Sequence, residues 1–147
     1  MSDYEFQKIE SKWQNYWSDN NSIKSDINSV DNNFYNLCMY PYPSGDLHMG
    51  HIRNYTIGDV ITRYKIMNGF NVLSPMGWDS FGLPAENAAI KTGIHPKTFT
   101  EERINNMKDQ IIRLGSLYEW DREVAAHSKD YYKWTQFIFI KLFKNKL

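Results

Sequence analysis

The stretch LCMYPYPSGDLHMGH, residues 37–51, decides the fold of this 147-residue chain. It opens with a short apolar run, Leu37 to Tyr40, which has the length of one buried strand. Pro41 and Pro43 follow, and each ends strand pairing because proline lacks an N–H group and has a fixed φ. A serine–glycine turn comes next. The stretch therefore predicts a strand that ends at a tight turn.

Two histidines, His48 and His51, close this stretch with Gly50 between them. A helical pattern is expected directly after them, over Ile52–Met67, so they lie where a strand passes into a helix N-terminus. The first N–H groups of a helix have no internal partner, and the helix dipole favours a phosphate there. Imidazoles can donate hydrogen bonds to phosphate oxygens, and a glycine allows close approach to the backbone. A four-residue HxGH pattern also fits a loop with two surface histidines.

A strand, a helix and a strand follow one another in this part of the chain. The strands are expected at Phe34–Tyr40 and Phe70–Ser74, and Asn68-Gly69 is a C-terminal stop for the helix between them. Such a unit makes the two strands parallel, with a right-handed crossover. Ligands of such sheets bind beyond the carboxyl ends of the strands, and here the histidines follow one of those ends. The sequence therefore predicts an α/β fold.

Further helices are expected on both sides of this unit. An amphipathic pattern predicts a helix over Asp3–Trp17, and a polar loop with at most an edge strand follows it to Asn33. We expect 1–33 to form an N-terminal helix with its loop, and 34–147 to form the main domain. Capping and stop signals predict the remaining helices at Pro84–Lys91, from a capping box at Thr98 and Glu101 to Leu114, and from Ser128 to Lys144.

Composition narrows the function classes. The 17 basic and 17 acidic residues leave no net charge, so no basic surface indicates nucleic acid. The one cysteine, Cys38, excludes an internal disulfide and a cysteine zinc site, and its apolar surroundings place it in the core. His95 and His127 have no motif around them and are expected on the surface. No apolar run is long enough to span a membrane and the N-terminus is polar, so a cytoplasmic location is expected.

Two blocks of this sequence resemble the class I aminoacyl-tRNA synthetases. MYPYPSGDLHMGHIRNYTIGDVITRY, residues 39–64, resembles the HIGH region of that class, in a form similar to the leucyl-tRNA synthetases. GWDSFGLPAENAA, residues 77–89, is similar to the next signature of the same family. The resemblance implies the first half of a Rossmann-like (HUP-type) nucleotide-binding domain, with parallel strands and an N-terminal helical extension.

The resemblance also implies a reaction and a set of site residues. Leucine and ATP would give leucyl-adenylate and pyrophosphate, followed by transfer to tRNA(Leu), with catalysis by positioning and charge stabilisation. The resemblance makes His48 and His51 the phosphate donors, and Asp79 the partner of the leucine ammonium. Mg²⁺ would arrive with ATP, and no metal site or protein-bound zinc is expected in this chain. The other implied contacts are Pro41, Pro43, Gly45, Gly50 and Asn54 for ATP, and Met39, Tyr40 and Tyr42 for leucine.

Synthetases of this kind are several times longer than 147 residues. They carry a second half of the nucleotide fold, a KMSKS loop, an editing domain, zinc modules and an anticodon-binding part. We therefore expect an incomplete catalytic domain, either a natural fragment or a truncated product, with the missing remainder as its partner. Two alternatives stay open. One is an inactive fragment that binds nucleotide weakly, and the other is a small nucleotidyltransferase with an HxGH turn, against which the GWDSFGLPAE block argues.

Overall fold

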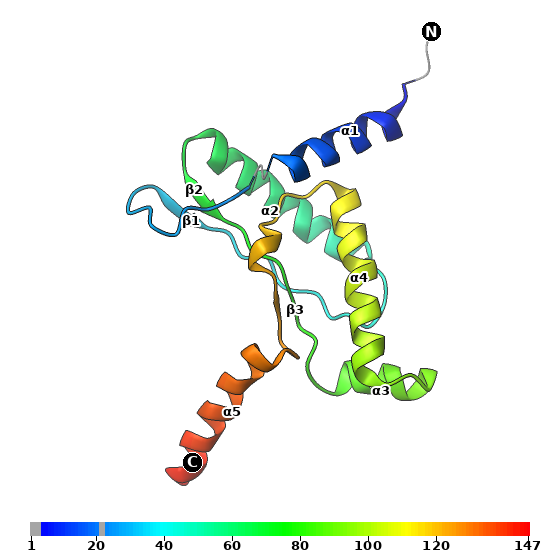
Figure 1. The fold of residues 1–147 in the computed structure, drawn as a ribbon, viewed down its shortest axis with the longest axis vertical. Coiled ribbons are helices and arrows are strands. Elements are labelled where there is room, and N and C mark those ends of the chain that lie inside the picture. Colours follow the sequence, from blue (N-terminus) through cyan, green and yellow to red (C-terminus); the bar gives the residue numbers. More distant parts are fainter. Residues whose placement is uncertain (1–3, 21–22) are drawn as a thin grey trace.

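The computed structural model describes residues 4–20 and 23–147. Asp3, the expected start of the first helix, and residues 21–22 of the polar loop lie outside the described residues. The described residues form five α-helices and short strands (Figure 1). The helices are α1 (Phe6–Asp19), α2 (Met49–Met67), α3 (Leu83–Thr92), α4 (Pro96–Leu114) and α5 (Lys129–Lys144). The strands are β1 (Asn33–Tyr35), β2 (Asn71–Leu73), β3 (Gly77–Trp78) and β4 (Val124–Ala125), with a 3₁₀ turn at Trp120–Arg122.

The strands pair in parallel around one central segment, residues 71–79. β1 pairs with β2, with Asn33 opposite Asn71, and β3 pairs with β4, with Gly77 opposite Val124. Since β2 and β3 follow each other along the chain, the central segment has a parallel neighbour on each side. The crossover from β1 to β2 runs through α2 (Figure 1). The α/β class, the parallel pairing and the helical crossover predicted from the sequence are confirmed.

The first strand is shorter and lies earlier than predicted. The paired residues are Asn33–Tyr35, whereas the prediction was Phe34–Tyr40. Beyond them the chain packs against α2. A Cβ on Gly58 would overlap the sulfur of Cys38, so the backbone of α2 is in direct contact with the Cys38 side chain. The apolar run from Leu37 to Tyr40 reflects this packing against α2. Burial alternates along the run, since Cys38 is 5% exposed and Leu37 is 56% exposed.

The starts of α2 and α4 also differ from the prediction. α2 begins at Met49, three residues before the expected Ile52, because His48 is its N-cap. α4 begins at Pro96, and its N-cap is His95, whose Nδ1 accepts a hydrogen bond from the N–H group of Lys97 (3.2 Å). The capping box predicted at Thr98 and Glu101 was therefore wrong. Proline suits the first position of a helix because its missing N–H would be unpaired there anyway.

The stops of α3 and α4 are confirmed. Gly93 and Gly115 follow these helices with φ of 71° and 78°, the left-handed conformation that glycine adopts without strain. Ser128 is the N-cap residue of α5, as predicted, although its side chain makes no capping hydrogen bond.

The core lies between the central segment, α2 and α4. On α4, Ile104, Met107 and Ile111 are buried, whereas Leu114 is 37% exposed because it stands at the last turn of the helix. Cys38 belongs to the core, as expected. The buried cluster consists of Cys38, Tyr55, Met76, Trp78, Ile104, Met107, Ile111 and Tyr118.

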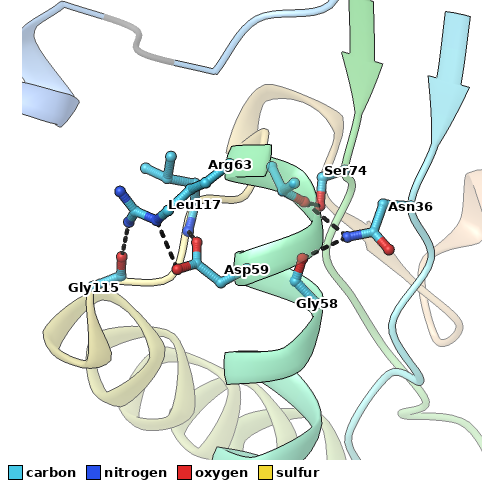
Figure 2. A network of polar contacts seen from close by, with 8 residues as sticks. Asn36, Gly58, Asp59, Arg63, Ser74, Gly115 and Leu117 are labelled. Atoms are coloured by element: carbon cyan, nitrogen blue, oxygen red, sulfur yellow. Dashed lines mark hydrogen bonds and ion pairs between the residues drawn. The ribbon is translucent and has the colours of Figure 1, made fainter. Parts of the chain in front are cut away.

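A polar network fixes α2 between the central segment and the turn after α4 (Figure 2). Asp59 accepts hydrogen bonds from the N–H group of Leu117 (2.7 Å) and from Arg63 Nε (2.7 Å). Arg63 also donates to the carbonyl oxygen of Gly115 (2.7 Å). Asp59 and Arg63 thus hydrogen-bond two backbone groups of that turn, one N–H group and one carbonyl oxygen. On the side of the sheet, the hydrogen-bonded pairs are Asn36 with Gly58, Asn36 with Thr62, and Thr62 with Ser74.

The first and last helices lie at opposite ends of the long axis (Figure 1). α1 has no buried residue, and it contacts the body through Trp17, whose ring lies 4.5 Å from the guanidinium carbon of Arg63. α5 likewise has no buried residue, and it exposes large apolar side chains such as Trp134 (61%) and Phe143 (72%). No helix in residues 4–20 and 23–147 is long and apolar enough to cross a membrane.

Candidate functional site

The two histidines of the central stretch form a reciprocal cap on α2. The N–H group of Gly50 donates to Nδ1 of His48 (3.1 Å), and the N–H group of His48 donates to Nδ1 of His51 (3.2 Å). Because each Nδ1 is an acceptor, each neutral ring carries its proton on Nε2. The cap thus satisfies backbone donors at the helix start and leaves an Nε2–H donor on each ring.

Ring stacking holds these side chains in place. The centroids of His48 and His51 are 3.9 Å apart with an angle of 27° between the planes, and His51 also stacks on Tyr55 at 5.9 Å and 14°. Burial lowers the pKa of His51 from its ordinary value, and the charge of the adjacent His48 lowers it further. A proton on Nδ1 of His51 would also remove the acceptor for the N–H group of His48. The neutral, Nε2-protonated form of His51 is therefore favoured near neutral pH.

Gly50 is needed for this arrangement. A Cβ at this position would lie 2.9 Å from Cε1 and 3.0 Å from Nδ1 of His48, closer than ordinary contacts allow. The glycine therefore lets the His48 ring fold back over the first turn of α2. The expected closeness of Gly50 to ATP stays a prediction.

α4 holds the loop that leads to the histidines. Gln110 Oε1 accepts a hydrogen bond from the N–H group of Leu47 (2.9 Å), and Asn106 Nδ2 donates to the carboxylate of Asp46. Sequence reasoning missed both α4 residues, because they lie about 60 positions from their partners and no local pattern reports such pairing.

The first strand segment, which is β1 together with the chain after it to Pro41, ends beside the carboxyl end of β3. The N–H group of Asp79 donates to the carbonyl oxygen of Pro41 (3.1 Å), and Asp79 itself is exposed just beyond β3. Tyr42, Pro43 and Asp79 line one small pocket together with Ser44, Ser80, Phe81 and Pro84. The structure thus brings Pro41, Pro43, Tyr42 and Asp79 together, as parallel strands that end at one edge require.

Four more of the predicted ATP and leucine contacts do not line that pocket: Met39, Tyr40, Gly45 and Asn54. Met39 is 77% exposed, and Tyr40 is packed against the core with its ring over Gly77. Burial raises the pKa of Tyr40, and Tyr35 and Tyr131 add to that rise. Gly45 borders open space, and Asn54 is half-buried on α2. Tyr40 therefore has a packing function, whatever contact it makes with a ligand.

Two further residues support the site without having been predicted. Tyr55 is fully buried, stacks on His51, and donates from its hydroxyl group to the carbonyl oxygen of Met39 (3.4 Å). Its position four residues after His51 on the same helix face was the available signal. His127 was expected on the surface, but it is half-buried with Nδ1 2.6 Å from Ser80 Oγ. No sequence signal could have found that pair, because 47 residues separate its members.

No resident metal is indicated within the described residues. Outside positions 1–3 and 21–22, no three His, Cys, Asp or Glu side chains are grouped so that they could hold a metal ion.

Comparison with known proteins identifies the family of this chain. Residues 12–147 match the family described as tRNA synthetases class I (I, L, M and V). Leucine–tRNA ligase of Fusobacterium nucleatum is 56% identical over 149 aligned positions, which cover the whole of this chain and 17% of that protein. The Thermotoga petrophila leucine–tRNA ligase is 51% identical, again over the whole chain and 18% of the relative. The chain thus spans about a sixth of the length of these curated relatives.

A solved structure agrees with the sequence comparisons. A chain in the ternary complex of Agrobacterium radiobacter LeuRS, tRNA and LeuAMS superposes with a TM-score of 0.91 at 44% identity. The superposition covers 98% of this chain and 18% of that one. With its HxGH cap at the end of the first strand segment and Asp79 at the end of the next, the chain belongs to the class I tRNA synthetases.

Proposed function

We propose that this chain is the part of a leucine–tRNA ligase that holds ATP and leucine while leucine is activated. The reaction joins a carboxylate oxygen of leucine to the α-phosphorus of ATP. The bond from that phosphorus to its bridging oxygen breaks, and pyrophosphate leaves with that oxygen. The leucyl group of the adenylate would then pass to tRNA(Leu) in the complete enzyme, in the cytoplasm.

One observation carries the proposal, the reciprocal cap of His48 and His51 at the start of α2. It leaves two Nε2–H donors next to the partial positive charge of a helix N-terminus, which together suit the phosphate oxygens of ATP. Positioned donors of this kind act on the charge that develops in the transition state. Loss of one typically lowers the rate about a hundred- to a thousandfold.

Asp79 is proposed to hold the α-ammonium of leucine. Its carboxylate is exposed beside Tyr42 in the small pocket at the strand ends. A hydrogen bond between charged groups contributes about 1.5–3 kcal/mol, enough to orient the amino acid. The leucine carboxylate, attached to the same carbon as the ammonium, would then be directed to the α-phosphate near the histidines.

The remaining assignments are part of the same proposal. Pro41, Pro43, Gly45, Gly50 and Asn54 would border ATP, and Met39, Tyr40 and Tyr42 would border the leucine side chain. Mg²⁺ would enter with ATP, since it prefers phosphate oxygens and water to an all-protein cage. Residues 1–33 would be an N-terminal extension, and 34–147 would be the first half of the catalytic domain, completed by the remainder of the synthetase.

ATP binding by the 147-residue chain tests the proposal. We expect weak, Mg²⁺-dependent binding in a calorimetric or NMR titration, and leucine-dependent pyrophosphate exchange that is very slow or absent. His48→Asn is the informative variant, because asparagine still caps a helix but has no Nε2–H donor at the position of the ring. It should weaken ATP binding about tenfold, the effect of one hydrogen bond to a charged group.

The chain offers a matched control for that variant. His95 caps α4 in the same way, with Nδ1 accepting from the N–H group of Lys97. His95→Asn should therefore leave ATP binding unchanged. An equal loss in both variants, or none in His48→Asn, would remove the histidines from the proposed site. ATP binding without any response to leucine would instead favour an inactive nucleotide-binding fragment.

A further inference from the structure

A histidine far from the HxGH turn contacts the loop that carries Asp79. His127 lies between β4 and α5, and its Nδ1 is 2.6 Å from Oγ of Ser80, the residue after Asp79. Ser80 is only 4% exposed and His127 is half-buried, so water competes little for this contact. The side chain therefore connects the β4–α5 junction to the carboxyl end of β3.

Backbone hydrogen bonds hold the same loop from both sides. Toward β4, the N–H group of Ala126 donates to the carbonyl oxygen of Trp78 (3.0 Å). Toward the first strand segment, the N–H group of Asp79 donates to the carbonyl oxygen of Pro41 (3.1 Å). The contact between Ser80 and His127 comes directly after the last of these bonds on the β4 side. The contact between Ser80 and His127 thus extends the hydrogen bonding between β3 and β4 to the residue directly after Asp79.

The hydroxyl proton of Ser80 has two acceptors within reach. One is Nδ1 of His127 at 2.6 Å, and the other is the carbonyl oxygen of Trp78 at 3.2 Å. With the ring proton on Nε2, the hydroxyl group donates to Nδ1 of His127. With the ring proton on Nδ1, Nδ1–H donates to Oγ and the hydroxyl proton turns to the Trp78 carbonyl. Both tautomers keep the contact, so it serves as a fixed connection.

The contacts of Ser80 favour a structural function for this pair. Ser80 is 4% exposed, and its hydroxyl group lies within hydrogen-bonding distance of Nδ1 of His127 and of the carbonyl oxygen of Trp78. The neighbouring Phe81 is instead 62% exposed and stacks on Tyr132 of α5, with ring centroids 5.6 Å apart. Two consecutive residues after Asp79 therefore contact the region around the start of α5, one by a hydrogen bond and one by stacking.

We propose that His127 is a positioning residue for amino-acid capture, holding the Asp79 loop through Ser80 so that the Asp79 carboxylate stays beside Tyr42. The inference rests on the proposed function, which makes Asp79 the partner of the leucine ammonium. It adds a residue from outside both signature blocks. It also assigns the β4–α5 junction a function in leucine binding, and none in ATP binding.

The test uses the 147-residue chain and two ligands. His127→Ala and Ser80→Ala should each weaken leucine binding about tenfold, the effect of losing one well-formed hydrogen bond, with ATP binding within about twofold of the parent. The double variant should be no weaker than Ser80→Ala, because that single variant already removes both bonds of the Ser80 hydroxyl group to His127, the one to Nδ1 and the one from the backbone N–H group (3.4 Å). His127→Asn, whose amide can reach Ser80, should restore most of the affinity for leucine.

Lys129→Ala is the matched control, because Lys129 is exposed and lines the same cavity between α3, α4 and α5 as His127. It should change neither affinity. Equal losses for leucine and ATP in His127→Ala would indicate general unfolding and overturn the positioning role. Unchanged leucine binding in both alanine variants would overturn it as well.

Amide hydrogen exchange provides a readout that needs no ligand. The N–H group of Asp79 should exchange faster in Ser80→Ala and His127→Ala than in the parent and in Lys129→Ala. If the parent chain bound no leucine while this difference appeared, the proposed function would fail and the structural connection would stand. Unchanged exchange at Asp79 would refute the connection itself.

Discussion

Gly58 on α2 and Cys38 beside the sheet are in backbone-to-sulfur contact, with no room for a Cβ between them. Alanine normally stabilises a helix interior by about 1 kcal/mol relative to glycine. Here the sign should reverse, because the added methyl group would overlap a buried sulfur.

Gly58→Ala should therefore lower the free energy of unfolding, by about 1–3 kcal/mol as overpacking typically does. Urea denaturation followed by circular dichroism measures it. Cys38→Ala removes the sulfur, so Gly58→Ala should cost less in that background than in the parent. A stabilised Gly58→Ala variant would show that α2 can move away from the sheet.

Asp59 anchors the turn after α4 through the N–H group of Leu117 and the side chain of Arg63 (Figure 2). Asp59→Ala leaves both donors without their acceptor and should lower the free energy of unfolding by about 1–3 kcal/mol. Asp59→Asn keeps an acceptor for Leu117 and should cost less. Thermal or urea denaturation would rank the two variants.

The matched control for Asp59 is an ion pair on the surface. Glu5 pairs with Lys8, and their side chains are 66% and 81% exposed. Glu5→Ala should change the free energy of unfolding by less than about 0.5 kcal/mol, since exposed pairs contribute little. An effect as large as that of Asp59→Ala would mean that burial does not explain the difference.

The pH dependence of stability should include His51. Burial, and then the charge of His48, lower its pKa in the folded chain, so protonation favours the unfolded chain. Stability is therefore fully present above the unfolded pKa of about 6.5 and declines as pH falls from there toward the lower folded pKa. Urea denaturation at a series of pH values, with NMR titration of the ring proton of His51, measures both quantities.

His51→Gln isolates that contribution. Glutamine can still accept from the N–H group at the N-cap, as in a capping box, but it does not titrate. The decline of stability below about pH 6.5 should be shallower in this variant. The same slope in parent and variant would assign the pH dependence to other groups.

Asp79 should separate the two ligands. Asp79→Ala should weaken leucine binding about tenfold or more, the usual effect of losing a hydrogen bond between charged groups, and should leave ATP binding almost unchanged. Asp79→Asn should lie between, because it keeps an acceptor without the charge. Parallel titrations with leucine and with ATP measure the difference. Equal losses for both ligands would refute the assignment of the ammonium site.

Local sequence signals determined much of the architecture. The glycines at positions 93 and 115 ended helices in the left-handed conformation that glycine permits. The two histidines were placed correctly at the N-terminus of α2, where His48 is the N-cap. Each of these features depends on a few neighbouring residues, so the chain reveals them without its fold. The family resemblance was likewise carried by contiguous blocks, and it was confirmed.

Only the tertiary structure decided which residues support the site. The strand predicted to reach Tyr40 stops pairing at Tyr35, where Cys38 and Gly58 bring α2 against the chain. His127 looked like a surface residue, yet it contacts Ser80 across 47 positions. The physical reason is the same in both cases. Burial and hydrogen bonding between distant segments depend on how the elements pack, and the local preferences that a sequence displays do not contain that packing.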